Sequence, residues 1–240
     1  MNIALILAGG NKKSDTQGIP VQFITINDKP IFIYTLESFQ NHPQIDAIEV
    51  VCLDGWQDAT QAFGRQFNIT KLKWITKGGN TGQESIRNGI YRIREIVQDE
   101  DIIIIHDGIR PMVNKDVLSD VIRVATEQGN AVAATKFNEQ MFLVDDINIE
   151  RTNSFIDRDI LRKVTTPQAF TYKDLLISYE RAFRERIEIE SNSYTDTMMV
   201  ALGHSLHFAM GSDQNIKIET DEDIELFKSL LLETNSKWLK

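Results

Sequence analysis

The chain has 240 residues, of which 42% are hydrophobic, enough to bury the core of one domain. Its net charge of −9, with no block of lysine and arginine, argues against a nucleic-acid partner, since polyphosphate binding usually leaves a basic footprint. Cys52 is the single cysteine, which excludes disulfide frameworks and thiolate metal cages; we expect it to be reduced, as in the cytoplasm. The first apolar run is short and follows no basic segment, so neither a signal peptide nor a membrane helix is predicted.

The first predicted element is a strand over residues 3–8 that ends at two glycines. Six apolar residues in succession are typical of a strand buried on both faces. Gly9 and Gly10 predict a tight loop whose backbone N–H groups can approach a ligand, because glycine has no Cβ. The polar run that follows carries Lys12 and Lys13. These features predict a phosphate or nucleotide site, with an ordinary strand and a solvated turn as the alternative.

Strands and helices alternate regularly over the next hundred residues. The pattern predicts helices at 31–39, 57–67, 84–97 and 117–127, and strands at 47–53, 72–75, 101–105 and 131–134. The strand at 101–105 is the most hydrophobic and is expected to be central. Such alternation predicts an α/β fold with a mostly parallel, doubly wound sheet that binds its ligand at the carboxyl ends of the strands.

The alternation fails after residue 136. Apolar, β-prone residues at 142–144 and 155–156 flank a turn-like segment at 145–148. This pattern predicts a hairpin over about 137–160 that projects from the sheet as a β-arm. A projecting arm often pairs with a second subunit, so we expect a homodimer.

The last third of the chain returns to mixed elements. Helices are predicted at 173–186 and from 220 to 232, and strands at 206–210 and near 216–218. Thr220 and Asp223 form the pattern of a capping box at the start of the last helix. No linker or internal repeat divides the sequence, so residues 1–240 are expected to form a single domain.

Four loops lie at predicted strand ends, at 9–21, 78–85, 107–111 and 213–217. Asp107 and Asp213 supply two carboxylates, and Mg²⁺ prefers a few carboxylates together with water and phosphate oxygens. The residues of the four loops, taken together, therefore predict transfer of a phosphoryl or nucleotidyl group, a reaction that depends mainly on positioning and positive charge. The cations that would neutralise phosphates are Lys12, Lys13, Arg110 and Lys217.

Each of these residues also has a simpler interpretation. Asp107 can be a turn-forming aspartate, and Arg110 can pair with a surface carboxylate. Lys217 can be a charge at a strand edge, and His106 is expected to be structural. The sequence contains no phosphate-binding G-x-x-x-x-G-K-[ST] motif, no full G-x-G-x-x-G and no G-x-S-x-G, which argues against the common nucleotide-binding and hydrolase classes.

Seven short motifs occur in a fixed order, at 7–10, 20–23, 29–30, 78–79 with Ser85, 106–111, 166–170 and 215–218. This order resembles the cytidylyltransferases that act on 2-C-methyl-D-erythritol 4-phosphate and on ribitol 5-phosphate. The likeness covers nearly the whole chain, and the H-D-x-x-R-P and N-I-K motifs are fairly specific. Segments 7–10 and 81–85 are more similar to the polyol-phosphate branch, associated with teichoic acid or capsule, than to the isoprenoid branch.

The resemblance implies a Rossmann-like nucleotidyltransferase fold and a homodimer that exchanges the β-arm. It implies the reaction of CTP with a sugar or polyol phosphate, such as ribitol, glycerol or methylerythritol phosphate, to give a CDP-product and pyrophosphate with Mg²⁺. The nucleotide would be bound by Ala8, Gly9, Gly10, Gly79, Asn80 and Ser85, and the metal by Asp107 and Asp213. Lys217 would stabilise the pentavalent phosphorus, and the acceptor would face Arg110, Arg158, Thr166 and Thr195.

The opening loop departs from the family pattern, which reads G-x-G-x-R followed by P-K-Q. Here Lys12 stands at the second glycine, Ser14 near the arginine and Val21 at the lysine. Losing one such charge typically costs about 10²–10³ in rate, so losing both without compensation would leave little activity. Lys12 and Lys13 are the candidates to compensate, and Lys13 is the one expected to be catalytic. Lys136 and Gln140 stand where the family usually has a proline and a threonine near the acceptor. Two alternatives follow: an impaired homologue that binds a nucleotide or a partner without turnover, and an enzyme with altered base or acceptor preference.

Overall fold

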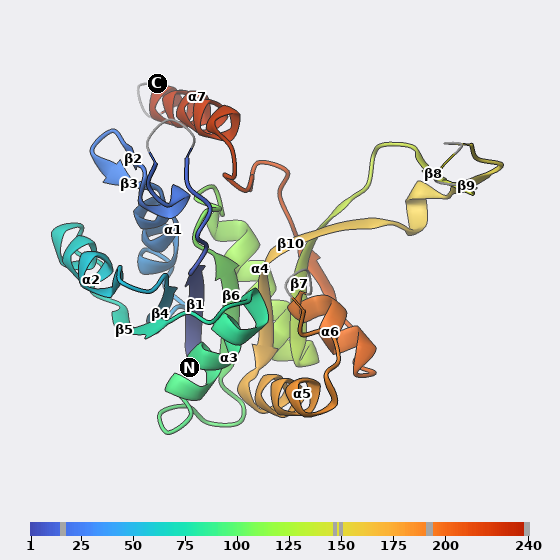
Figure 1. Cartoon of the computed structure of the whole chain (residues 1–240), viewed down its shortest axis with the longest axis horizontal. Helices are drawn as coiled ribbons and strands as arrows, with labels where there is room; N and C mark the ends of the chain where they lie inside the picture. The colour runs from blue at the N-terminus through green and yellow to red at the C-terminus, as the bar shows by residue number, and fades with distance from the viewer. Residues whose placement is uncertain (15–17, 146–147, 149–150, 191–193, 238–240) are drawn as a thin grey trace.

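The computed structural model describes residues 1–14, 18–145, 148, 151–190 and 194–237, and the side chains among them up to residue 232. Its centre is a seven-stranded sheet in the order β11-β7-β10-β6-β1-β4-β5 (Figure 1). Six strands run parallel, namely β1 (Asn2–Ala8), β4 (Ala47–Cys52), β5 (Leu72–Lys77), β6 (Ile102–Asp107), β7 (Asn130–Lys136) and β11 (Phe208–Met210). The predicted α/β fold with a mostly parallel sheet is therefore confirmed.

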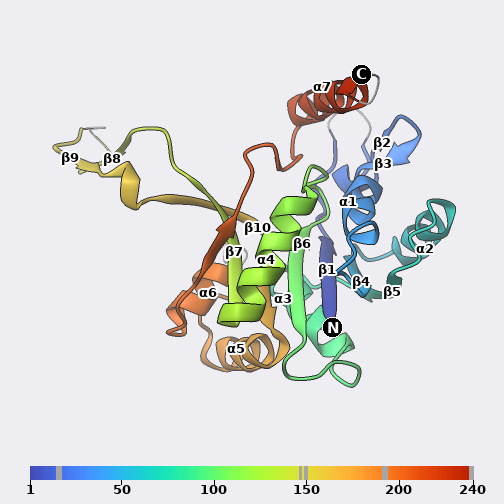
Figure 2. The ribbon, with the colours of Figure 1, turned by 180° about the vertical axis from the view of Figure 1, so that it is seen from behind.

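Helices cover both faces of this sheet, as the views from the front and from behind show (Figures 1 and 2). Phe32, Leu36 and Leu118 belong to the apolar core on one face. Ile90, Leu175 and Met198 belong to the core on the other face. The first face carries α1 (Ile31–Gln40), α2 (Gln57–Gln66) and α4 (Lys115–Gln128), and the second carries α3 (Gly82–Arg92), α5 (Tyr172–Glu185) and α6 (Thr195–Ala201).

One strand was not predicted. Strand β10 (Arg162–Thr171) lies between β6 and β7 and runs antiparallel to both. It includes Pro167, a residue that argues against a central strand because proline cannot donate to the ladder. The register of the pairing with β7 shifts between Thr165 and Gln168, and this irregularity accommodates the proline. The sheet is consequently mixed.

Two other expectations about local structure are wrong. Helix α3 ends at Arg92 rather than near Val97, and Val97 N instead closes a turn on Ile93 O at 3.2 Å. Residues 216–218 form no strand, although Ile218 N donates to Ile109 O at 2.9 Å. In both places apolar residues are buried without belonging to a helix or strand. The apolar pattern alone therefore predicted a longer helix at α3 and a strand at 216–218 that is absent.

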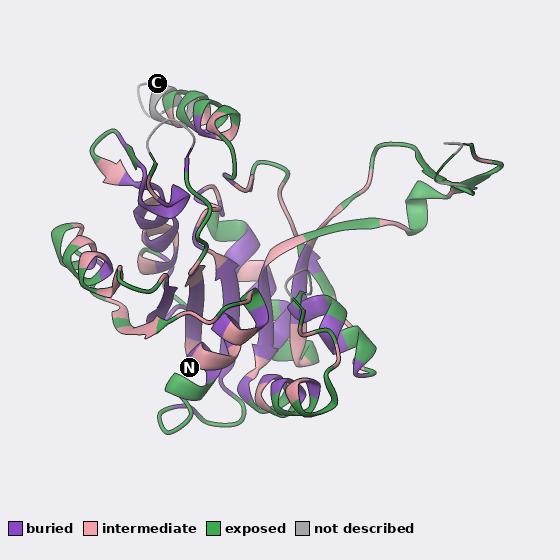
Figure 3. Ribbon diagram, viewed as in Figure 1, coloured by how far each residue is buried: buried purple, intermediate pink, exposed green. Residues whose placement is uncertain are grey.

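The predicted arm is present. Strands β8 (Met141–Leu143) and β9 (Ser154–Ile156) pair in antiparallel fashion and form a separate two-stranded sheet. The arm projects far from the main sheet and is mostly exposed (Figures 1 and 3). Its turn was predicted at 145–148, of which residues 146–147 lie outside the described residues.

The C-terminal helix α7 (Asp221–Lys237) packs near the opening loop, η1 (Val21–Phe23) and a small hairpin of β2 (Thr25–Ile26) and β3 (Lys29–Pro30) (Figure 1). Its capping box is confirmed: Thr220 Oγ1 accepts from Asp223 N at 3.2 Å, and Asp223 Oδ2 accepts from Thr220 N at 2.9 Å. Within the described ranges, no helix has the length and apolar character needed to cross a lipid bilayer.

Candidate active site

The floor of the candidate site is made by glycines that follow β1 and β5. Gly78 N donates to Cys52 O at 2.8 Å, so the loop after β5 begins against the end of β4. A Cβ added at Gly78 would lie 3.2 Å from both Cys52 O and Ser85 Oγ, and one added at Gly9 would lie 3.6 Å from the same hydroxyl. Glycine therefore allows the loops after β1 and β5 to approach each other closely at the carboxyl edge of the sheet.

Gln22 orients the backbone of the opening loop. Its buried Nε2 donates to Ala8 O at 3.0 Å and to Gly10 O at 2.7 Å. The C=O and N–H groups of a trans peptide unit point in opposite directions, so the N–H groups of Gly9 and Asn11 face away from Gln22. Side-chain hydrogen bonds thus fix the loop in a form that presents backbone donors.

The loop before α3 is held by its own side chains. Ser85 Oγ accepts from Gly79 N at 3.0 Å and donates to Thr81 O at 2.9 Å. Glu84 Oε2 accepts from Asn80 N at 2.7 Å, and Thr81 caps the helix by accepting from Glu84 N at 3.1 Å. The positive end of the α3 dipole therefore lies beside the loop that carries Gly79 and Asn80, and the Glu84 carboxylate already occupies it.

Charged residues gather at the end of β6. Arg110 Nε lies 2.8 Å from Asp107 Oδ2, and Lys217 Nζ lies 2.9 Å from Glu219 Oε1. Burial lowers the pKa of Lys217, but the nearby carboxylates of Asp107 and Glu219 outweigh it and raise the pKa above its ordinary value. Two cations, Arg110 and Lys217, are therefore brought together at this edge, as phosphate binding requires.

Asn215 joins three segments around this charge cluster. Its Nδ2 donates to Thr166 O at 2.7 Å, and its backbone O accepts from Arg110 Nη1 at 2.9 Å. Thr166 Oγ1 in turn accepts from Asp107 N at 3.2 Å. Asn215 is 2% exposed, and its Oδ1 has no hydrogen-bond partner among the described residues. The amide thus fixes Arg110 and Thr166 relative to each other and keeps one buried acceptor available.

His106 is a structural residue rather than a base. Its Nε2 donates to Arg110 O at 3.0 Å, which holds the loop after β6 in a tight turn. Burial lowers its pKa to about 4, so the imidazole is neutral at physiological pH. The expected structural role of His106 agrees with this geometry.

The opening loop does not present the two cations that the family pattern contains. Val21, at the position of the lysine, is 3% exposed and packs in an apolar cluster with Ile224 and Phe227 of α7. Ser14, near the position of the arginine, is buried and donates to Asp221 Oδ1 at 2.9 Å. The loop is therefore attached to α7 at the positions where charge is missing; residues 15–17 lie outside the described part of the chain.

The lysines of this loop have different surroundings. Burial raises the pKa of Asp223, but hydrogen bonds from Glu219 and Thr220 outweigh it and lower the pKa below its ordinary value. The charge of the nearby Lys12 makes a smaller contribution in the same direction. Lys13 is exposed, and its backbone pairs with Pro20 in an isolated bridge. Both side chains are exposed on the opening loop.

The two predicted metal ligands are placed differently. Asp107 stands in the charge cluster, with Oδ2 bonded to Arg110. The carboxylate of Asp213 is exposed and engages Thr135 Oγ1 at 3.2 Å and Lys163 Nζ at 3.3 Å. No group of three or more metal-ligating side chains occurs among the residues that the structure describes. The donor set fits an ion that takes one or two carboxylates and completes its shell with phosphate oxygens and water, as Mg²⁺ does.

Two predicted acceptor residues lie outside the cluster. Thr195 is 3% exposed, and its hydroxyl donates to Tyr179 Oη at 2.8 Å, which donates to Gln83 Oε1 at 2.7 Å. Its hydroxyl is thus part of a hydrogen-bond network that joins α6 to α5 and α3. Arg158 lies in the arm, with Nη1 donating to Asn138 O at 3.0 Å. Among the other predicted residues, the structure brings Asp107, Arg110, Thr166 and Lys217 together at the end of β6, and Gly9, Gly79 and Ser85 together at the ends of β1 and β5.

Comparison with known proteins shows which family the chain resembles in sequence and in fold. A sequence model of the 2-C-methyl-D-erythritol 4-phosphate cytidylyltransferase family matches residues 2–233. A ribitol-5-phosphate cytidylyltransferase of Lacticaseibacillus paracasei is 48% identical over 97% of this chain and 99% of that protein. A 2-C-methyl-D-erythritol 4-phosphate cytidylyltransferase of Clostridium tetani is 33% identical over 93% of this chain and 87% of that protein. The crystal structure of 4-diphosphocytidyl-2C-methyl-D-erythritol synthase from Anaerococcus prevotii is 20% identical, covers 96% of this chain and 98% of its own, and has a TM-score of 0.79. The chain therefore belongs to the 2-C-methyl-D-erythritol 4-phosphate cytidylyltransferase family.

Proposed function

We propose that this cytidylyltransferase uses ribitol 5-phosphate as its acceptor and forms CDP-ribitol and pyrophosphate from CTP. The observation that carries the proposal is the 48% identity to a protein named ribitol-5-phosphate cytidylyltransferase, against 33% to one named for methylerythritol 4-phosphate. Both alignments extend over more than nine-tenths of this chain, so the difference in sequence identity reflects the whole sequence and not one motif.

In the proposed reaction an oxygen of the acceptor phosphate attacks the α-phosphorus of CTP. A new P–O bond forms, and the bond between the α-phosphorus and the bridging oxygen breaks to release pyrophosphate. The backbone donors of the loop at Gly9 would hold the nucleotide against the loop at Gly79, whose own N–H group is bonded to Ser85. Lys217 and Arg110 would neutralise the charge that develops on the phosphorus oxygens, and Lys13 would reach the triphosphate from the opening loop.

Mg²⁺ fits this site through Asp107. One carboxylate is compatible with a hard cation that takes most of its ligands from the triphosphate and water. When bound, the ion would supply further positive charge against the phosphate oxygens. Asp213 would join it only after leaving Lys163 and Thr135, with which its carboxylate now interacts.

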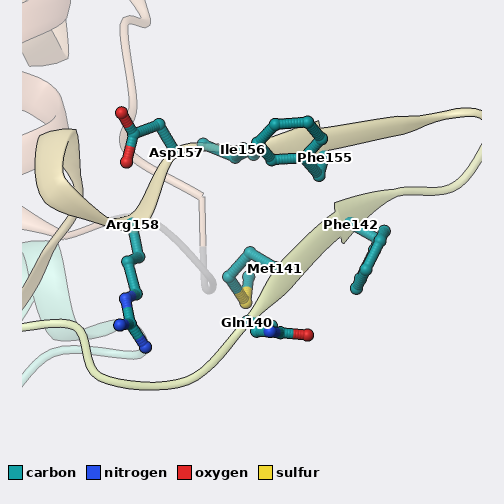
Figure 4. Close-up of a pocket in the computed structure, with 7 residues that line it drawn as sticks. All are labelled: Gln140, Met141, Phe142, Phe155, Ile156, Asp157 and Arg158. Atoms are coloured by element: carbon teal, nitrogen blue, oxygen red, sulfur yellow. The ribbon is translucent and has the colours of Figure 1, made fainter.

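We also propose that the protein is a cytoplasmic homodimer joined through its arm. Apolar side chains of the arm are exposed around an open cavity of about 390 Å³ lined by Met141, Phe142 and Phe155 (Figure 4). Phe155 is 74% exposed, and exposed apolar patches of this kind mark interaction sites. Arg158 borders the same cavity, so a second copy seated on the arm would be next to this guanidinium.

The test is pyrophosphate release by the purified protein with CTP, Mg²⁺ and the phosphates of ribitol, glycerol and methylerythritol as acceptors. We expect kcat/KM for ribitol 5-phosphate to exceed the values for the other two. Absence of turnover with every acceptor, together with measurable binding of CTP, would instead support the impaired homologue. The burial of Val21 and the bond of Ser14 to Asp221 are the observations that favour that second candidate.

A further inference from the structure

One buried hydroxyl joins the three helices that cover the second face of the sheet (Figure 1). Tyr179 of α5 is fully buried, and its Oη donates to Gln83 Oε1 of α3 at 2.7 Å. The hydroxyl of Thr195, the first residue of α6, donates to the same Oη at 2.8 Å. Burial raises the pKa of Tyr179, so its hydroxyl stays protonated at physiological pH. We call these three side chains the Tyr179 network.

At one end the Tyr179 network reaches the loop that carries Gly79. Gln83 is 1% exposed, and its Nε2 donates to Glu188 O at 2.8 Å, so both polar groups of its amide are engaged. Gln83 lies in the first turn of α3 together with Ser85, whose Oγ accepts from Gly79 N at 3.0 Å. The bond from Tyr179 therefore fixes the helical turn from which Ser85 holds this loop.

At the other end the network reaches the segment that carries Thr166. The residue after Thr195 is Asp196, whose side chain is also buried. Burial raises the pKa of the Asp196 carboxyl, and hydrogen bonds from the backbone and from the Gln168 side chain partly oppose the rise. Gln168 is buried on β10, two residues beyond Thr166, and Thr166 Oγ1 accepts from Asp107 N in the charge cluster. The first turn of α6 is therefore attached to the strand that places Thr166.

We propose that Tyr179 is a positioning residue of the transfer reaction, which acts through Gln83 on the loop at Gly79 and through Thr195 on the Thr166 segment. This inference rests on the proposed function and adds Tyr179 to it. A buried hydroxyl with two buried partners has few geometries that satisfy all three groups, because an unpaired polar group in a core is costly. Side chains locked in this way hold a site more precisely than packing alone, and a displacement of about 1 Å can lower a rate by about 10².

The first test removes only the hydroxyl. Tyr179→Phe keeps the ring and leaves Gln83 and Thr195 without their common partner. We expect calorimetric titration with CTP and Mg²⁺ to show binding about three- to tenfold weaker than in the wild-type protein, and KM for ribitol 5-phosphate to rise by a similar factor. Tyr172→Phe is the matched control, because Tyr172 is another buried tyrosine of α5 and its hydroxyl donates to the backbone oxygen of Ile90 at 3.4 Å. Unchanged CTP binding by Tyr179→Phe, or equal weakening in the control, would contradict the proposal.

Variants that cut one branch of the network distinguish positioning from a general structural role. We expect Gln83→Met to weaken CTP binding more than it raises KM for ribitol 5-phosphate, and Thr195→Val to do the reverse. A general loosening of the core would change both quantities by the same factor in both variants, and that result would overturn the proposal. Gln83→Met also keeps the nucleotide branch testable if circular dichroism shows that Tyr179→Phe is unfolded.

A double variant tests whether Thr195 acts through Tyr179 or touches the acceptor itself. Tyr179→Phe and Thr195→Val remove the same hydrogen bond, so we expect KM of the double variant for ribitol 5-phosphate to stay within about twofold of the value for Tyr179→Phe. A further rise of about tenfold would show direct contact with the acceptor and would overturn the acceptor branch of the proposal.

CTP binding separates this inference from the proposed function, because it needs neither the acceptor nor turnover. If CTP binding depends on Tyr179 and Gln83 but no acceptor yields a product, the positioning role is supported and the proposed reaction fails. If Tyr179→Phe forms the product with the kcat/KM of the wild-type protein, the proposed reaction is supported and the positioning role is wrong.

Discussion

At the scale of single residues, Lys217 is central to the proposed chemistry. The neighbouring carboxylates keep it protonated, and it shares the end of β6 with Arg110 and Asp107. We predict that Lys217→Ala lowers kcat by about 10²–10³, since it removes a cation aimed at developing negative charge. Lys228→Ala is the control, because Lys228 is an exposed lysine paired with Glu225 on α7. A kcat within about twofold of the wild-type value would show that Lys217 has no part in the chemical step.

Glu49 provides a prediction about stability. It is fully buried on β4, with Thr76 Oγ1 donating to Oε1 at 2.6 Å and no hydrogen-bond partner for Oε2 among the described residues. Burial raises its pKa from 4.5 to about 7, while the Thr76 bond and the charge of Arg92 partly oppose this rise. The fold therefore favours the neutral carboxyl, so the free energy of unfolding falls as pH rises above 4.5 and levels off above pH 7.

We predict that Glu49→Gln removes this part of the pH dependence. Urea unfolding at pH 5.5 and pH 8 should show a smaller loss of stability for the variant than for the wild-type protein, by roughly 2 kcal/mol, because the unfolded carboxyl is already mostly ionised at pH 5.5. Glu100→Gln, at an exposed glutamate, serves as the control. Equal losses in the wild-type protein and Glu49→Gln would mean that Glu49 is already ionised in the fold.

At the scale of elements, the opening loop and α7 form one packed unit. Val21 contacts the apolar cluster that includes Ile224 and Phe227, and Ser14 bonds to Asp221. We predict that Val21→Lys lowers the free energy of unfolding by about 2–4 kcal/mol, because it places an ammonium group in this cluster. Val21→Met, which has a similar length and no charge, should cost less than half as much. Urea unfolding measures both, and a stable Val21→Lys with raised kcat would show that the loop turns this position toward the nucleotide.

The accuracy of the sequence-based prediction also varies by element. Strands β1, β4 and β6 and helices α1, α4 and α5 were predicted to within a few residues, because their patterns are local and strongly periodic. Strand β10 was not predicted, because its place between β6 and β7 depends on pairing with distant residues and it contains Pro167. Local pattern cannot reveal such long-range pairing.

The same contrast between local pattern and long-range contact applies to the candidate site. Asp107, Arg110 and Lys217 were predicted because their types and positions at strand ends already indicate phosphate chemistry. The sequence did not reveal that Gln22 bonds to the carbonyl oxygens of the opening loop, since these groups meet only in the folded chain. It likewise did not show that the hydroxyl of Thr195 is engaged by Tyr179.

At the scale of the whole molecule, the exposed arm predicts a dimer. Phe142 and Phe155 are large apolar residues with little cover, and they border one cavity (Figure 4). We predict that sedimentation velocity shows a dimer for the wild-type protein and a monomer for the double variant Phe142→Ser, Phe155→Ser. Ile177→Ser, at an exposed isoleucine of α5, should remain dimeric. A monomeric wild-type protein, or a double variant that stays dimeric, would rule out association through the arm.

The central claim is that the whole assembly transfers a cytidylyl group to ribitol 5-phosphate. Its most direct measurement is mass spectrometry of the products formed by the purified protein from CTP, ribitol 5-phosphate and Mg²⁺. The account predicts CDP-ribitol and pyrophosphate in equal amounts, and neither product from the Lys217→Ala variant above about a hundredth of the wild-type rate. Intact CTP and ribitol 5-phosphate after prolonged incubation with folded, CTP-binding protein would contradict it.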